Sequence, residues 1–176
     1  LYVFLDGVFG HTITATVPAA PLSKVSPVMV AAGTGYTVDY TQANSVTFFK
    51  EVATHYVTEY GIDGWRLDQA YQVPPAIWSE IRTAVETAAT ARKNAGETWG
   101  TLGHMVGEVW RSSAEISAEA YGPANAPALK SAFDFPLRYG VVHALAVGEW
   151  MDGGDATHLN ASWNSIDNYP MHAMPN

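Results

Sequence analysis

Two patterns of apolar positions alternate along the chain. Short runs rich in strand-forming residues are apolar at successive positions, which is typical of strands buried on both faces of a parallel sheet. They predict strands over residues 1–5, 62–68, 102–110 and 132–135. Between them, apolar residues recur with a helical period. This period predicts helices over residues 45–60, from 74–75 to 94–96, over 113–121 and over 137–147.

The clearest helix covers residues 45–60, where apolar side chains recur at steps of three and one. We expect Asn44 or Ser45 to cap its start and Gly61 to end it in the left-handed conformation. The next helix opens at Pro74 and Pro75, because proline is tolerated in a first helical turn.

Two segments lack a sustained period. Residues 12–35 are interrupted by three prolines and two glycines, and we expect a long irregular insertion there. Long loops inside an α/β domain are usually functional or inserted. From residue 149 to residue 172 the pattern dissolves again into Gly, Asp and Asn.

The alternation of strands and helices predicts an α/β fold built from parallel βαβ units. Units of roughly 30 residues favour part of a (β/α)8 barrel, which typically needs about 250 residues in full. A chain of 176 residues is therefore too short for a closed barrel. A small doubly wound sheet is the alternative that would be complete at this length.

Composition narrows the function classes. Nine basic residues against 17 acidic ones give a net charge of −8, which disfavours binding to nucleic-acid phosphates. No apolar run reaches the roughly 20 residues of a membrane-spanning helix. The absence of Cys excludes disulfides and Cys-ligated metal sites. Because the chain begins at Leu1 without a signal-like stretch, we expect it to be a piece of a longer protein.

Acidic residues fall at the ends of the predicted strands or within them. They are Asp6, Asp68, Glu108 and Asp134. In parallel α/β folds the carboxyl ends of strands line the ligand crevice, so these side chains are expected to converge. Converging carboxylates either bind a divalent cation or perform acid–base and nucleophilic work on a substrate such as a glycoside. A strand-end Asp can also simply cap a loop.

Arg66 lies two residues before Asp68, so both side chains share one face of a strand. A guanidinium there would keep Asp68 ionised, as a nucleophile requires, although a purely structural ion pair fits the pattern equally well. Glu108 has mainly apolar sequence neighbours, and an apolar environment favours the protonated form of a carboxyl group. One charged and one protonated carboxyl group are what retaining glycoside hydrolysis requires.

Three short motifs resemble the catalytic barrel of glycoside hydrolase family 13, the α-amylase family. They are DGVFGH at residues 6–11, GWRLD at 64–68 and GEVW at 107–110. Each is weak alone, but they follow the family's order and each lies at a predicted strand end. The resemblance extends to about Phe135 and implies that the chain is a fragment covering about strands three to six of a (β/α)8 barrel. Residues 12–40 would be a short version of the family's inserted domain.

The resemblance implies a role for each matching residue. Asp68 would be the nucleophile, and Glu108 the general acid and then the general base. Arg66 would hold Asp68, with Asp6 as a supporting acid. His11 would hydrogen-bond the sugar ring in the subsite where the cleaved bond begins.

Trp110 follows Glu108 by two positions and is a candidate for the wall of the cleft. The implied substrate is an α-glucan such as starch or a maltooligosaccharide, cleaved through a glycosyl-enzyme intermediate. An extracellular or periplasmic location is favoured by the resemblance alone.

The chain departs from the family pattern at several positions. Gly10 stands where many members have an Asn that ligates calcium, and glycine offers no side-chain oxygen. Asp39 is the other candidate calcium ligand, and a solvated loop Asp explains it equally well. Tyr71 and Gln72 replace the Lys-His pair of typical α-amylases. The family's third acid has no match, because Asp167 lacks its motif.

Three alternatives remain at this point. A metal-dependent barrel enzyme would use the four strand-end acids as ligands, and an α-glucan transglycosylase would share the family's machinery. A non-catalytic carbohydrate-binding or scaffold relative ranks last, because both Asp68 and Glu108 are present. We expect the fragment by itself to be inactive, because its missing strands would leave sheet edges unpaired.

Overall fold

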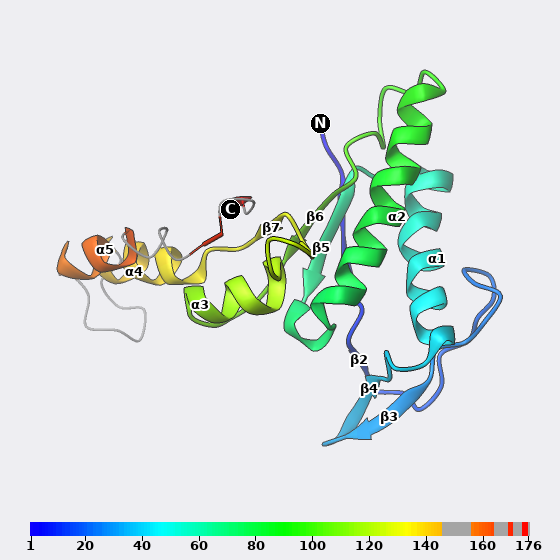
Figure 1. Cartoon of the computed structure of the whole chain (residues 1–176), viewed down its shortest axis with the longest axis horizontal. Helices are drawn as coiled ribbons and strands as arrows, with labels where there is room; N and C mark the ends of the chain where they lie inside the picture. Colours follow the sequence, from blue (N-terminus) through cyan, green and yellow to red (C-terminus); the bar gives the residue numbers. More distant parts are fainter. Residues whose placement is uncertain (146–155, 164–168, 171–173, 176) are drawn as a thin grey trace.

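A computed structural model of the chain describes residues 1–145, 156–163, 169–170 and 174–175 (Figure 1). Within these residues the main sheet has five strands in the order β1-β5-β6-β7-β8, and every neighbouring pair is parallel. The strands are β1 (Phe4–Val8), β5 (Gly64–Asp68), β6 (His104–Gly107), β7 (Ser131–Ala132) and β8 (Met174–Pro175). The predicted α/β fold with a parallel sheet is confirmed.

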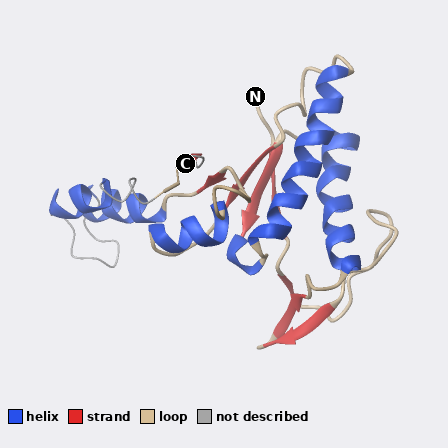
Figure 2. Ribbon diagram, in the orientation of Figure 1, coloured by secondary structure: helices blue, strands red, loops and turns tan. Residues whose placement is uncertain are grey.

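Two long helices cover this sheet and pack against each other (Figures 1 and 2). They are α1 (Ala43–Tyr60) and α2 (Pro75–Asn94). Apolar and aromatic side chains fill the core, and Phe9 lies against Phe49, Trp65 and Trp78. The Trp65 indole donates a hydrogen bond to the Ala53 carbonyl of α1, which ties strand to helix.

The ends of α1 agree only in part with expectation. Gly61 ends the helix at φ 66°, as predicted, and its N–H bonds back to the carbonyls of the last turn. Neither Asn44 nor Ser45 caps the start, because the helix begins after Gln42 without a side-chain cap. The buried Ser45 hydroxyl instead accepts a hydrogen bond from the Val28 N–H, and so attaches the insertion to α1.

The insertion is more regular than expected. It contains a small antiparallel sheet in the order β2-β4-β3, formed by β2 (His11–Thr12), β3 (Met29–Ala32) and β4 (Gly35–Val38). The expectation of an irregular segment was wrong for these strands. Each strand has at most four residues, which is too short for a pattern of period two to stand out.

The later units also differ in detail. A short 3-10 helix (Ala70–Gln72) follows β5, and α3 (Ser113–Ile116) continues into a π-helical turn (Ser117–Tyr121), as the predicted helix over 113–121 requires. Strand β7 ends at Ala132, so Asp134 lies beyond the strand rather than within it.

Helix α4 (Phe135–Leu145) confirms most of its predicted range, and residues 146–147 lie outside the described part. Helix α5 (Ala156–Trp163) was not expected, because its residues lie where the sequence pattern dissolves. No helix in the described residues is both long and apolar enough to cross a membrane.

Candidate active site

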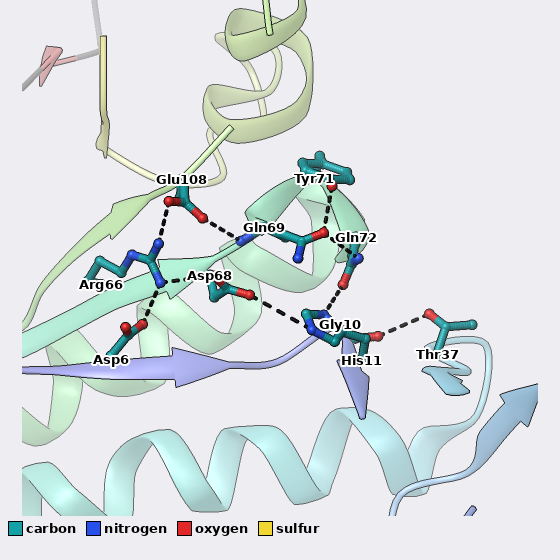
Figure 3. Close-up of polar contacts among 10 residues, drawn as sticks. All are labelled: Asp6, Gly10, His11, Thr37, Arg66, Asp68, Gln69, Tyr71, Gln72 and Glu108. Carbon is teal, nitrogen blue, oxygen red and sulfur yellow. Dashed lines mark hydrogen bonds and ion pairs between the residues drawn. The ribbon is translucent and has the colours of Figure 1, made fainter. Parts of the chain in front are cut away.

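One arginine contacts three carboxylates on the first three strands of the main sheet or directly after them (Figure 3). Arg66 Nη1 lies 2.7 Å from Asp6 Oδ1 and 3.0 Å from Asp68 Oδ1, and Nη2 pairs with Glu108 Oε1. Asp6 is the register partner of Arg66 on β1, and Asp68 lies two residues further along β5. Because side chains alternate along a strand, all three point to one face.

The four side chains differ in exposure. Glu108 is 8% exposed, Asp68 23% and Arg66 27%, whereas Asp6 on the edge strand is 67% exposed. Burial by itself would lower the pKa of Arg66, but its hydrogen bonds to Asp6 and Glu108 and their negative charges raise that pKa above the usual value. Arg66 is therefore a permanent cation within the site.

Glu108 is held by groups that its sequence neighbours did not indicate. The residue follows β6 directly, and its backbone N–H donates to the Leu67 carbonyl at 2.9 Å. Its Oε2 accepts from the backbone N–H of Gln69 at 3.3 Å, and its Oε1 contacts Arg66. The expectation of an apolar pocket was therefore wrong for the carboxyl group, although the side chain is buried. The apolar residues beside Glu108 in the sequence therefore do not describe the environment of its carboxyl group.

His11 joins the same site from the start of β2. Its Nε2 lies 3.9 Å from Asp68 Oδ2, and its Nδ1 lies 2.6 Å from Gln72 Oε1. The structure therefore brings together five predicted residues, namely Asp6, His11, Arg66, Asp68 and Glu108 (Figure 3).

Trp110 and Asp134 lie outside this set of contacts. The Trp110 side chain is 61% exposed beyond β6, and its ring meets Phe135 edge to face at 6.2 Å. Asp134 is buried, and its Oδ1 accepts hydrogen bonds from the Leu137 N–H and from the Tyr169 hydroxyl. Asp134 thus caps the start of α4 instead of joining the cluster of Arg66.

Asp39 and Gly10, the two positions that bear on the calcium site of the family, have other contacts in the described residues. Asp39 Oδ1 accepts from the backbone N–H and the hydroxyl of Thr41, and these bonds lower the pKa of Asp39. The space beside Gly10 is filled by the Gln72 side chain. In the part of the chain that is described, no three His, Asp or Glu side chains gather as metal ligands would. Arg66 places a guanidinium among Asp6, Asp68 and Glu108.

Sequence reasoning missed the hydrogen-bonded side chains of Gln69, Tyr71 and Gln72 beside His11. The Tyr71 hydroxyl donates to Gln69 Oε1 at 2.6 Å, and the Gln72 amide donates to the same oxygen at 3.0 Å. The only sequence signal was the departure of positions 71 and 72 from the family pattern. Asp167, which failed to match the third acid, lies outside the described residues.

No protein-family model matches the chain. Solved structures of other proteins do match it. AmyP in complex with maltose is 43% identical with a TM-score of 0.84, over 100% of this chain and 35% of that chain. The α-amylase of Geobacillus thermoleovorans, complexed with acarbose, is 18% identical with a TM-score of 0.69, over 98% and 38%. That second likeness shows the fold alone.

Among curated proteins, the intracellular maltogenic amylase of Bacillus subtilis is 28% identical over 100 residues, which are 54% of this chain and 16% of that protein. The chain thus spans only a part of the relatives that it matches. The parallel α/β fold, the motifs and these likenesses agree with one another. They confirm the resemblance of this chain to glycoside hydrolase family 13, the α-amylase family.

Proposed function

We propose that the chain is part of the catalytic barrel of a retaining α-glucan hydrolase that acts on starch or maltooligosaccharides. The observation that carries the proposal is the pairing of Asp68 and Glu108 with the same guanidinium of Arg66. Retaining hydrolysis needs two carboxyl groups about 5 Å apart, and two carboxylates on neighbouring amino groups of one guanidinium are consistent with that separation. Solved complexes of AmyP contain maltose and maltotriose, which supports this substrate class.

In the first step, Asp68 attacks the anomeric carbon of the sugar while Glu108 donates its proton to the leaving oxygen. The glycosidic bond breaks and an ester bond to Asp68 forms. Arg66 orients the Asp68 carboxylate through the 3.0 Å contact to Oδ1. Because Arg66 contacts both carboxyl groups, the choice of nucleophile and acid follows the family motifs rather than the ion pairs.

In the second step, Glu108 accepts a proton from water, and the resulting hydroxide attacks the anomeric carbon. The ester bond breaks, Asp68 leaves as a carboxylate, and the configuration of the sugar is retained. The backbone N–H of Gln69, 3.3 Å from Glu108 Oε2, keeps the acid in place through both steps. Trp110 would offer its exposed ring to a sugar at the rim.

In this proposal β1, β5, β6 and β7 correspond to about strands three to six of the barrel, and β8 to the strand that follows. The small sheet within residues 12–40 is a short form of the family's inserted domain, and it delivers His11 to the site. The remaining strands and the third acid would come from other parts of a longer protein. The 176-residue chain alone is therefore expected to be inactive.

The test uses the full-length protein with maltooligosaccharides and follows the anomeric form of the product by proton NMR. We expect hydrolysis with initial release of the α-anomer, unaffected by a chelator. Initial release of the β-anomer would contradict the retaining mechanism. Loss of activity with a chelator would favour the metal-dependent alternative, and products longer than the substrate would favour the transglycosylase.

A further inference from the structure

We propose that Gln72 is a positioning residue that keeps the proton of the neutral His11 ring on Nδ1, so that Nε2 accepts a hydrogen bond from a sugar hydroxyl. The identification of the hydrogen-bond donor as a sugar hydroxyl rests on the proposed function. The placement of the proton rests only on the contacts of His11 and Gln72 (Figure 3).

The Gln72 amide is held at its nitrogen end. Its Nε2 donates to Gln69 Oε1 at 3.0 Å, and the Tyr71 hydroxyl donates to that same oxygen at 2.6 Å. This leaves Gln72 Oε1 directed at His11 Nδ1, 2.6 Å away. A carbonyl oxygen can only accept a hydrogen bond, so in this orientation of the amide Nδ1 carries the hydrogen.

A neutral imidazole carries one proton, so a proton on Nδ1 leaves a lone pair on Nε2. Nε2 lies 3.9 Å from Asp68 Oδ2, beyond hydrogen-bond distance. Both side chains are partly exposed, so a ligand can reach them. The geometry therefore presents an unused acceptor on Nε2 beside the nucleophile, and its natural partner is a hydroxyl group of the substrate.

Gly10 makes room for this arrangement. A Cβ atom on residue 10 would lie 2.4 Å from Gln72 Cβ and 2.5 Å from Gln72 Oε1, closer than packed atoms approach. Any other residue at position 10 would displace the amide that holds His11. Gly10 and Gln72 both depart from the family pattern, and the close contact explains why the two departures belong together.

The proton is located by nitrogen NMR of the full-length protein labelled with ¹⁵N-histidine, with His11 assigned from its loss in His11→Gln. At a pH where the ring is neutral, we expect Nδ1 to show the shift of a protonated nitrogen and Nε2 that of an unprotonated one. The reverse pattern would overturn the proposal. This readout does not depend on activity, so it stands apart from a failure of the proposed function.

Variants test whether Gln72 determines which nitrogen of His11 carries the proton. Gln72→Met keeps the length but removes the acceptor, and Gly10→Ala displaces the amide, so both should give averaged Nδ1 and Nε2 signals. Gln72→Glu keeps an accepting oxygen and should retain the proton on Nδ1. Gln42→Met, the same change at an exposed position before α1, is the matched control and should leave the signals unchanged.

Kinetics give the second readout. If the full-length protein hydrolyses maltooligosaccharides, Gln72→Met should lower kcat/KM about 10-fold, the effect of one lost hydrogen bond. Unchanged NMR signals and unchanged kcat/KM in both Gln72→Met and Gly10→Ala would show that Gln72 does not position His11.

Discussion

Arg66 is one cation among three carboxylates. When Glu108 holds the proton that the first step requires and Asp6 and Asp68 are ionised, the group carries a formal charge of −1, since the guanidinium offsets one of the two negative charges. An excess of negative charge in a partly buried site stabilises positive charge that develops on a bound molecule. The transition state of glycoside hydrolysis carries such charge on the sugar ring. The site is thus suited electrostatically to the proposed reaction.

Arg66→Lys tests whether the geometry of this cation matters. A lysine ammonium is a single point charge and cannot contact Asp6, Asp68 and Glu108 from two separate nitrogens. We expect kcat/KM of the full-length protein to fall about 10- to 100-fold, as for the loss of one charged hydrogen bond. Arg92→Lys, in a helix away from the site, is the control and should stay near the wild-type value. An unaltered kcat/KM in Arg66→Lys would mean that charge alone suffices.

At the scale of elements, the long helices could be predicted from sequence, whereas the short strands of the insertion and the bounds of β7 could not. The apolar period along α1 and α2 is sustained over four or more turns, so their ranges agree within a few residues. Strands β2, β3 and β7 have two to four residues, and tertiary contacts rather than local pattern decide where they pair.

The candidate site was also predictable only in part. Arg66, Asp68 and Glu108 could be expected together, because strand ends of a parallel sheet meet and side chains alternate along a strand. Asp6 joins them from within β1, and the expectation that it ends its strand was wrong. The bond between His11 and Gln72 joins residues 61 positions apart, and no local pattern signals it. Asp134 was misplaced because a strand of two residues ends earlier than its apolar run.

The first residue of β6 makes stability depend on pH. Burial lowers the pKa of His104 below its usual 6.5, and its ring packs edge to face on Phe4 at 5.8 Å. Between the lowered pKa and 6.5 the unfolded chain binds more protons than the folded chain. The free energy of unfolding therefore rises with pH in that window and loses this contribution as the pH falls through it.

Urea denaturation of the full-length protein across this window tests the effect. We expect His104→Phe to flatten the dependence of stability on pH, because the variant keeps the aromatic contact without a titrating group. His55→Phe, which leaves His104 in place, should retain the wild-type slope. If the free energy of unfolding had the same slope against pH in wild type and His104→Phe, His104 would not be the source of the pH dependence.

The start of β5 depends on a buried acid. Asp63 is 2% exposed, and its two oxygens accept from the backbone N–H groups of Val3 and Gly100 at 3.0 Å and 3.1 Å. Asp63→Ala leaves both donors without this partner, and we expect the free energy of unfolding to fall by about 3 kcal/mol. Urea denaturation measures the change. Glu59→Ala, on the exposed end of α1, should change it by no more than about 0.5 kcal/mol. A loss of that small size in Asp63→Ala would contradict the role of Asp63.

For the whole molecule, the exposed edge of the sheet is the main consequence of the topology. Strand β1 pairs on one side with β5, and its other side has no partner in the described residues. Apolar side chains are exposed along and before it, namely Leu1, Tyr2, Val3, Phe4 and Val8. Helices α4 and α5 pack on each other at the end of the molecule far from α1 and α2 (Figure 1). Unpaired apolar edges invite association with other chains.

We therefore expect the isolated 176-residue chain to be at best marginally folded, and to release no maltose from maltooligosaccharides. Size-exclusion chromatography and urea denaturation of this chain, compared with the full-length protein, measure folding, and sugar analysis measures activity. A monomer with a cooperative unfolding transition and robust maltose release would overturn this expectation.

The most direct test of the central claim is to trap the sugar on the nucleophile. Glu108→Gln in the full-length protein is treated with an α-maltosyl fluoride, whose fluoride leaves without a proton donor. Water then lacks a base, so the covalent intermediate accumulates. Mass spectrometry of the digested protein should find one maltosyl group as an ester on Asp68, and none when Asp68→Asn is combined with Glu108→Gln. A maltosyl group on another residue, or none although fluoride is released, would contradict the account.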